Sequence, residues 1–273
     1  MRTEFFYGWY FKCQSDTRTL AVIPAVHGTG GKCTCSVQII TEEQAWTAEF
    51  PGDSFRRKGK SISIGRNRFG ERGVRLDIHV PGLEAEGELD FGLLSPPEYD
   101  IMGPFCLVPF LECRHSVWSM RHKVWGTVRI NETACTFDGA AGYWEGDRGR
   151  SFPREYIWTQ CIFPGGALML SVADIPLTGF HFRGIIGFVL LHGREYRLAT
   201  YLGAKAARVQ NGTVRVAQGS LELEARLLER ADHPLKAPIG GAMARTIHES
   251  PACRAGYGLR ENGRTLLAFE SDR

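Results

Sequence analysis

A short stretch near the middle of the chain, residues 142–161, combines carboxylates, arginines and aromatic rings beside a strand-like pattern. Glu145 and Asp147 are two residues apart, so in an extended strand both side chains lie on the same face. Burial disfavours the charged form of a carboxyl group and raises its pKa, so a carboxyl on an apolar wall can remain protonated near neutral pH. One member of the pair could therefore act as a general acid, with the second carboxylate orienting the first.

Other side chains in and around this stretch are suited to binding a substrate. Aromatic faces stabilise a nearby cation through their quadrupoles, and an arginine can either bind an anionic group or pair with a carboxylate. Such a pairing would lower the pKa of the carboxylate and make it a poor acid. The predicted substrate-binding residues are Trp9, Tyr143, Arg148, Arg154, Trp158 and Gln160.

A purely structural interpretation competes with the functional one. An arginine paired with Glu145 in a charged turn could hold two sheets together without any catalysis. The tryptophans could equally be core residues, and Gln160 could be a buried hydrogen-bond partner rather than a reactant. These alternatives stay open on the sequence alone.

The stretch resembles the signature of the tocopherol cyclase family, which reads Tyr-x-Glu-Lys-(Asn/Asp)-Trp-Gly-x-x-Phe-Pro-(Arg)-x-x-x-Trp-x-Gln-Cys. The residues in register are Tyr143, Glu145, Asp147, Gly149, Phe152, Pro153, Arg154, Trp158, Gln160 and Cys161. Residues 5–12 are similar to the family's opening Phe-Phe-Glu-Gly-Trp-Tyr-Phe-(Arg/Lys), and residues 221–226 and 234–238 are similar to its Glu-Ile-Glu-Ala-Arg and Pro-Leu-Arg-Ala-Pro. The resemblance thus extends over essentially the whole chain, with poorly matching segments in between.

This resemblance implies a lipocalin-like protein, related to carotenoid hydratases and Diels–Alder-type cyclases. In the family, an acid protonates a prenylated hydroquinone and the phenol oxygen captures the tertiary cation, closing a chromanol ring without a cofactor. Two positions depart from the pattern: Gly146 stands where the family has Lys, and Arg148 where it has Trp. If those family residues bind the substrate, the substrate of this chain differs.

Alternating apolar and polar residues dominate the rest of the chain, as along 74–80 and 221–227. This pattern predicts strands with one buried and one wet face. Asn-Gly pairs at 211–212 and 262–263 predict tight hairpin turns. We therefore expect an all-β protein made of two lipocalin-like antiparallel β-barrel or sandwich halves packed together. A Pro-rich stretch after residue 95 places the boundary near 118, which gives domains 1–118 and 119–273, the second carrying the signature stretch.

Composition, charge and motif spacing argue against several classes of function. The chain has 273 residues and a formal charge of +3, too small to indicate nucleic acid, and the basic run 56–60 is expected to be a solvated loop. Neither a signal peptide nor an apolar run long enough for a membrane helix is visible, which predicts a cytoplasmic protein whose eight cysteines stay reduced. The histidine spacings predict no metal site. Glycine-rich segments match neither the Walker nor the Rossmann pattern.

Three functions remain open. The leading prediction is a cyclase acting on a prenylated or polyene hydrophobic small molecule through Glu145 or Asp147. The second is a non-catalytic carrier of a hydrophobic ligand, and the third is an isoprenoid hydratase, which needs the same acid and an ordered water. The oligomeric state is left open.

Overall fold

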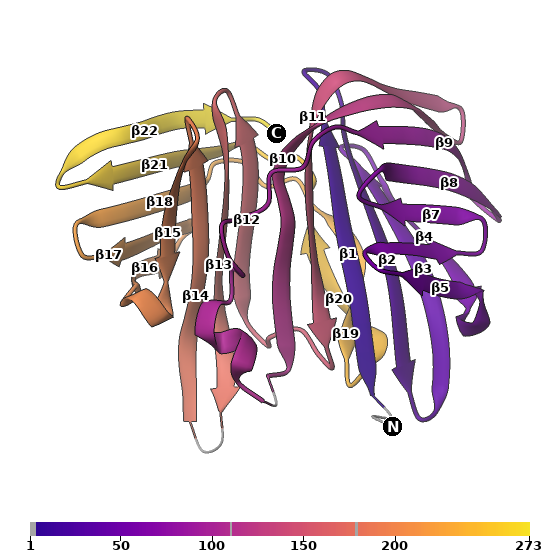
Figure 1. The fold of residues 1–273 in the computed structure, drawn as a ribbon, viewed down its shortest axis with the longest axis horizontal. Coiled ribbons are helices and arrows are strands. Elements are labelled where there is room, and N and C mark those ends of the chain that lie inside the picture. Colours follow the sequence, from indigo (N-terminus) through magenta and orange to yellow (C-terminus); the bar gives the residue numbers. More distant parts are fainter. Residues whose placement is uncertain (1–3, 110, 178–179) are drawn as a thin grey trace. The chain divides into compact units, whose positions relative to one another are not determined.

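The computed structural model describes residues 4–109, 111–177 and 180–273 (Figure 1). Contacts between residues divide the chain into two compact units. The first unit comprises residues 1–96, 111–152 and 233–251, and the second comprises 97–110, 153–232 and 252–273. Each unit is therefore assembled from segments that are distant in the sequence.

The first unit is built on one antiparallel sheet of eleven strands, in the order β4-β3-β2-β1-β11-β10-β9-β8-β7-β6-β5. Its strands are β1 (Phe5–Gln14), β2 (Thr19–Thr29), β3 (Lys32–Thr41), β4 (Ala45–Pro51), β5 (Phe55–Lys58), β6 (Ser61–Ile64), β7 (Asn67–Gly70), β8 (Gly73–Val80), β9 (Leu83–Phe91), β10 (Cys113–Ile130) and β11 (Thr133–Gly149). A short 3₁₀ helix, η1 (Gly52–Ser54), joins β4 to β5. The first and last segments of the sheet thus meet at its centre, where β1 pairs with β11.

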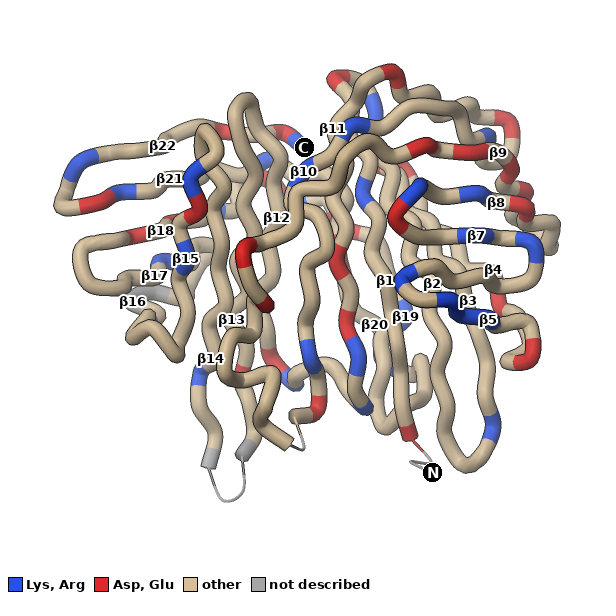
Figure 2. The backbone as a smooth tube through the Cα atoms, viewed as in Figure 1, with Lys and Arg blue, Asp and Glu red and all other residues tan. Residues whose placement is uncertain are grey.

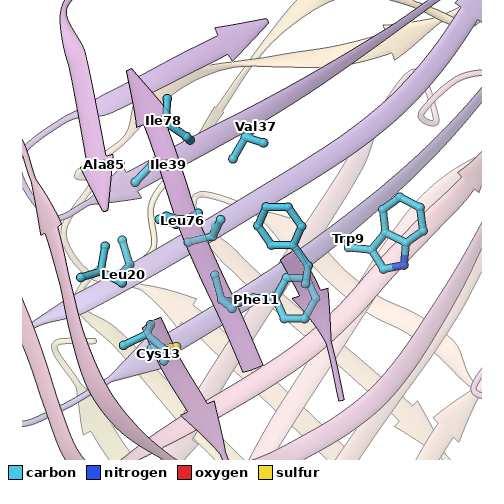
Figure 3. Close-up of a cluster of buried hydrophobic side chains, with 14 of the residues drawn as sticks. Trp9, Phe11, Cys13, Leu20, Val37, Ile39, Leu76, Ile78 and Ala85 are labelled. Carbon is cyan, nitrogen blue, oxygen red and sulfur yellow. The ribbon is translucent and has the colours of Figure 1, made fainter. Parts of the chain in front are cut away.

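One face of this sheet carries the hydrophobic core of the unit. Because side chains alternate along a strand, Trp9, Phe11 and Cys13 of β1 all point to this face (Figure 3). Phe11 stacks on Trp144 of β11 with ring centroids 5.2 Å apart. Burying each side chain of this size contributes about 1.5–3 kcal/mol to the stability of the fold. The intervening residues of β1 and β11 consequently face the other way.

A separate hairpin of the same unit, β19 (His233–Ile239) and β20 (Ala242–Glu249), packs on that other face. Gln38 of β3 fixes the hairpin through both ends of its amide. Its nitrogen donates to the carbonyl of Lys236 at 3.0 Å, and its oxygen accepts from the Lys236 N–H at 2.8 Å. The face opposite the core is therefore itself partly covered.

The second unit holds two further antiparallel sheets. One has the order β12-β13-β14-β15, and the other has the order β16-β17-β18-β21-β22. The strands are β12 (Tyr156–Phe163), β13 (Gly166–Leu177), β14 (Phe180–Leu191), β15 (Arg194–Ala199), β16 (Lys205–Gln210), β17 (Thr213–Gln218), β18 (Leu221–Leu227), β21 (Ala255–Glu261) and β22 (Arg264–Ser271), with 3₁₀ helices η2 (Gly103–Leu107) and η3 (Thr200–Leu202). A second hydrophobic core, including Leu168, Leu198 and Leu223, lies in this unit.

The predicted all-β, antiparallel, lipocalin-like class is confirmed, since the described helices are all short 3₁₀ turns. None of the described helices is long and apolar enough to cross a membrane. The domain arrangement differs from the predicted single boundary near residue 118. Residue 118 lies inside the unbroken strand β10, and the stretch 142–149 belongs to the first unit rather than to a second half. The reason is that β11 pairs with β1, a contact between distant segments that local pattern does not encode.

The basic run at 56–60 lies on β5 and the turn after it, at the edge of the sheet (Figure 2). Its side chains are exposed, and Lys60 forms an ion pair with Glu71 at 2.8 Å. Lysine and arginine on an edge strand discourage pairing with another chain. The solvated position that the sequence predicted for this run is observed.

Candidate functional site

Three adjacent strands, β1, β11 and β10, bring the candidate acid residues together. Residues directly opposite each other in neighbouring strands point to the same face. Glu145 lies opposite Tyr10 of β1, while Asp147 lies opposite Gly8 of β1 and His115 of β10. The extended geometry that was predicted for Glu145 and Asp147 is observed, and both point away from the hydrophobic core.

A continuous chain of polar contacts runs along this face. The Tyr143 hydroxyl donates a short hydrogen bond to Oε2 of Glu145. Nε2 of His115 lies 3.1 Å from the same oxygen, at ion-pair distance although without good hydrogen-bond alignment. On its other side, Nδ1 of His115 contacts Oδ1 of Asp147 at 3.0 Å, and the Cys113 thiol donates to that oxygen at 3.4 Å. His115 is thus held between two carboxylates.

Burial and charge set the protonation of this cluster. Burial by itself would lower the pKa of His115, but the Glu145 and Asp147 carboxylates outweigh it and raise the pKa well above its ordinary value. Burial, reinforced by Glu145, raises the pKa of the Tyr143 phenol. Burial, reinforced by Asp147, likewise raises the pKa of the Cys113 thiol. At neutral pH the histidine is therefore an imidazolium, and the phenol and thiol stay protonated.

This arrangement can store a proton and move it. The proton on Nδ1 of His115 points at Asp147. The side chain of Asp147 is 23 % exposed, which makes it more exposed than those of His115 and Glu145. Glu145, which is buried, neutralises the imidazolium from the other side and is held in place by the phenol of Tyr143. A histidine fixed between two carboxylates has the form of a general acid with a defined direction of delivery.

His115 was not among the residues predicted from the sequence. Its distance from His122, seven residues, matches no metal-site spacing. Two further residues of this face were also missed, Tyr10 and Lys12. Lys12 is only 2 % exposed and lies opposite Tyr143. The one available signal was the alternation of β1, which places Tyr10 and Lys12 on the face away from Trp9.

The predicted role of Trp9 in substrate binding is not supported by its position. Its side chain belongs to the hydrophobic core and stacks against Tyr7 and Phe55, with centroids 6.5 and 6.1 Å away. It therefore faces away from Glu145. The reason is the period of two along β1, which assigns Trp9 and Tyr10 to opposite faces.

Arg148 does not occupy the predicted position beside the carboxylates. Arg148 is exposed and follows Asp147 directly in β11, so it faces the opposite side of the sheet. Arg154 is an exposed residue of the second unit. Among the described contacts, His115 lies close to both carboxylates, at 3.1 and 3.0 Å.

Trp158 and Gln160 lie on β12 in the second unit and point to one face of its sheet. Gln160 is 7 % exposed, and neither its amide oxygen nor its nitrogen has a hydrogen-bond partner among the described residues. This excludes the interpretation of Gln160 as a satisfied hydrogen-bond partner within the described structure. An unpaired buried amide is costly.

The two departures from the tocopherol cyclase pattern both lie away from the acid cluster. Gly146 alternates with Glu145 and faces the core, where a Cβ would come 2.4 Å from the carbonyl oxygen of Gly8 and 2.8 Å from the ring of Trp118. A lysine does not fit at this position without movement of Trp118. Arg148 faces the same side as Gly146 and leaves the row of Tyr143, Glu145 and Asp147 unchanged.

Three solved structures share the fold of this chain at low sequence identity. CghA in complex with Sch210972 aligns over 98 % of this chain and 86 % of its own, with a TM-score of 0.62 and 8 % identity. Kievitone hydratase from Nectria haematococca aligns over 98 % and 88 %, with a TM-score of 0.58 and 8 % identity. An AttH-type protein of Nitrosomonas europaea aligns over 98 % and 90 %, with a TM-score of 0.57 and 10 % identity.

The fold is therefore shared along nearly the whole chain. No family model matches the sequence, and no curated protein matches it either. Across residues 4–109, 111–177 and 180–273, no group of three or more His, Cys, Asp or Glu side chains is arranged to hold a metal ion.

Proposed function

We propose that this protein is an acid catalyst that closes a ring on an unsaturated, hydrophobic small molecule, with a prenylated hydroquinone as the representative substrate. The observation that carries the proposal is the position of His115 between Glu145 and Asp147, at 3.1 and 3.0 Å. The resemblance of residues 142–161 to the tocopherol cyclase signature supports the same chemistry, because Tyr143, Glu145 and Asp147 match that pattern.

In the proposed reaction, the proton held between Nδ1 of His115 and Oδ1 of Asp147 is transferred to one carbon of the substrate alkene. A C–H bond forms, the π bond breaks, and the other carbon becomes a tertiary cation. The hydroxyl oxygen of the substrate attacks this cation to form the ring C–O bond. The hydroxyl proton returns through Asp147 to His115, so the product is an isomer of the substrate and the enzyme regains its starting state.

Each residue of the cluster has a distinct task in this scheme. Asp147 is the carboxyl nearest the substrate, His115 is the proton store, and Glu145 keeps the histidine charged and oriented. Tyr143 is a positioning residue, because its hydroxyl fixes the carboxylate of Glu145. In this scheme the proton is held by a histidine whose pKa is raised, and not by an isolated protonated carboxyl group.

The same cluster would support hydration if a water reached the cation before the internal hydroxyl. One protein of the same fold is named a hydratase, which makes this the second candidate. A carrier would bind the molecule and return it unchanged. Mass spectrometry of the reaction separates the three: cyclisation leaves the mass unchanged but alters retention, hydration adds the mass of one water, and a carrier gives neither.

The test uses purified protein with geranylhydroquinone and the variants His115→Gln, Asp147→Asn and Glu145→Gln. Loss of a positioned acid should lower kcat by about 10²–10⁴-fold. His122→Asn is the matched control, since His122 lies on the same strand but on the core side. Urea unfolding of each variant shows whether the loss reflects unfolding.

If the cluster is only a structural ion pair, the expected result is different. In that case the acid-cluster variants unfold more easily, because breaking a buried pair costs about 3–5 kcal/mol. Any activity would then fall only in proportion to the unfolded fraction. Turnover by all three variants at the wild-type rate would remove the cluster from the mechanism.

A further inference from the structure

The most unusual position beside the acid cluster is Gly8, at the centre of β1. Apart from its chain neighbours Tyr7 and Trp9, no atom of the described residues lies within 4 Å of the site where its Cβ would be, although the strand is flanked by β11 and β2. The nearby glycines of β11 are different: a Cβ at Gly142 would come 2.3 Å from His122, and one at Gly149 would come 1.9 Å from the carbonyl oxygen of Glu112. Those two glycines are required by close packing.

Neither packing nor backbone conformation explains the glycine at position 8. Gly8 does not have a positive φ, so an L-residue can adopt its conformation. A glycine in the middle of a strand costs about 0.5–1 kcal/mol relative to alanine. A glycine that lowers stability and is not required by packing indicates that the open space above it has a role in binding.

Chemically distinct groups border this space. Asp147 lies directly opposite Gly8 on β11, and Ala25 lies opposite it on β2. Phe6 and Tyr10, two residues away on each side, point to the same face, because side chains alternate along β1. Phe6 is buried and packs edge-on against Phe152, with centroids 5.4 Å apart. The carboxyl group of Asp147 therefore borders the space on one side and Ala25 borders it on the other. The aromatic residues Phe6 and Tyr10 lie at its two ends along β1.

We infer that the space above Gly8 holds the reacting alkene of the substrate, and that Gly8 determines how bulky the substituents on that alkene can be. Opposite residues in antiparallel strands are about 4.5–5.5 Å apart at Cα, so a planar group over Gly8 lies within reach of the Asp147 carboxyl. The cation formed there would be stabilised by the carboxylate and by the aromatic faces of Phe6 and Tyr10. This inference rests on the proposed function and specifies its substrate as an uncharged, unsaturated group, because an anion would be repelled by Asp147.

The test is a series of increasing size, Gly8→Ala, Gly8→Val and Gly8→Leu, measured with geranylhydroquinone. Each side chain points into free space, so the free energy of unfolding should stay at the wild-type value or rise. Calorimetric Kd and kcat/KM should worsen stepwise, modestly for alanine and at least about tenfold for leucine, a loss equivalent to about 1.4 kcal/mol.

The matched control is Gly258→Val in β21 of the second unit, where the nearest atom to a Cβ is the Leu267 carbonyl oxygen at 3.9 Å. That variant should bind and react like the wild type. Should Gly8→Leu prove unfolded in urea titration, Gly8→Ala and Gly8→Val carry the test.

The outcomes separate this inference from the proposed function. If the wild type cyclises the probe and Gly8→Leu does so equally well, the inference is wrong and the catalytic proposal stands. If the wild type binds without reacting and binding still weakens from alanine to leucine, the site above Gly8 is supported and the catalytic proposal fails. A wild-type protein that does not bind geranylhydroquinone overturns the inferred substrate class.

Discussion

His122 provides a prediction whose magnitude follows from its surroundings. It lies on β10 seven residues after His115, buried against Phe91 with ring centroids 4.4 Å apart. Ser119 Oγ donates to the carbonyl of Arg121 and accepts from the N–H of Ser95. Nδ1 of His122, 2.9 Å from Ser119 Oγ, is therefore the protonated nitrogen of a neutral ring.

Burial lowers the pKa of His122 from 6.5 to about 4. In the unfolded chain this histidine binds a proton as the pH falls below 6.5, whereas in the folded chain it resists until about pH 4. The folded state therefore loses stability on acidification. The difference of 2.5 pH units, 6.5 minus 4, at 1.36 kcal/mol per unit gives a loss of about 3.4 kcal/mol.

The assay is the free energy of unfolding from urea titrations at pH 7, 6, 5 and 4.5. The comparison is wild type against His122→Asn, whose amide nitrogen can replace Nδ1 as the donor to Ser119. The difference between the two proteins removes the contribution of every other titrating group. Between pH 7 and 4.5 the wild type should lose about 2–3 kcal/mol more than the variant.

Equal loss in the two proteins would show that His122 is not a buried neutral residue, and the placement of β10 against Phe91 would then be incorrect. Absolute stability is not the readout, because replacing an imidazole by a smaller amide leaves a cavity. Only the dependence on pH identifies the titration.

Three further predictions follow. The stabilisation from His115, whose pKa is raised, is fully present below pH 6.5 and is lost as the pH rises through the folded-state pKa; His115→Gln should abolish this alkaline loss in urea titrations. Gly146→Ala should lower the free energy of unfolding by about 1–3 kcal/mol, because its Cβ would clash with Gly8 and Trp118. Arg197 of the second unit donates to the carbonyls of Tyr99 and Asp100 and pairs with Glu195, whose side chain is 10 % exposed, at 2.5 Å. Arg197→Met should lower the free energy of unfolding by about 3–5 kcal/mol and speed limited proteolysis of segment 97–109.

The parts of the fold that depend on local pattern could be predicted. The alternation along 74–80 and 221–227 corresponds to β8 and β18. Asn211 and Asn262 have φ values of 52°, and each precedes a glycine that also has a positive φ. These are the conformations that two-residue hairpin turns require, and they connect β16 to β17 and β21 to β22.

Long-range strand pairing could not be predicted in the same way. Nothing in residues 5–14 specifies that they pair with residues 141–149, although this contact joins the N-terminal strand to the acid cluster. The same limit explains why the boundary near 118 was misplaced. The shared face of Glu145 and Asp147 was predictable from their spacing, whereas His115 as their partner was not.

The position of His115 shows why that partner was hidden. In the hairpin of β10 and β11, Ile130 pairs with Thr133, so paired residue numbers add up to 263 near the turn. Continued without interruption, this register would place His115 opposite Arg148 instead of Asp147. Three irregularities, at 117/119, 119/122 and 124/125, change the sum to 262, and His115 then pairs with Asp147.

A slip of one residue transfers every side chain of a strand to the other face. The irregularities in β10 therefore do more than bend the sheet. They place Asp147 opposite His115, while His122 and Val124 lie buried in the first unit. One strand thus supplies a histidine to the carboxylates on one face and another histidine to the opposite face. β-Bulges commonly re-aim side chains next to functional sites. The contact between His115 and Asp147 therefore depends on strand register and could not be read from sequence spacing alone.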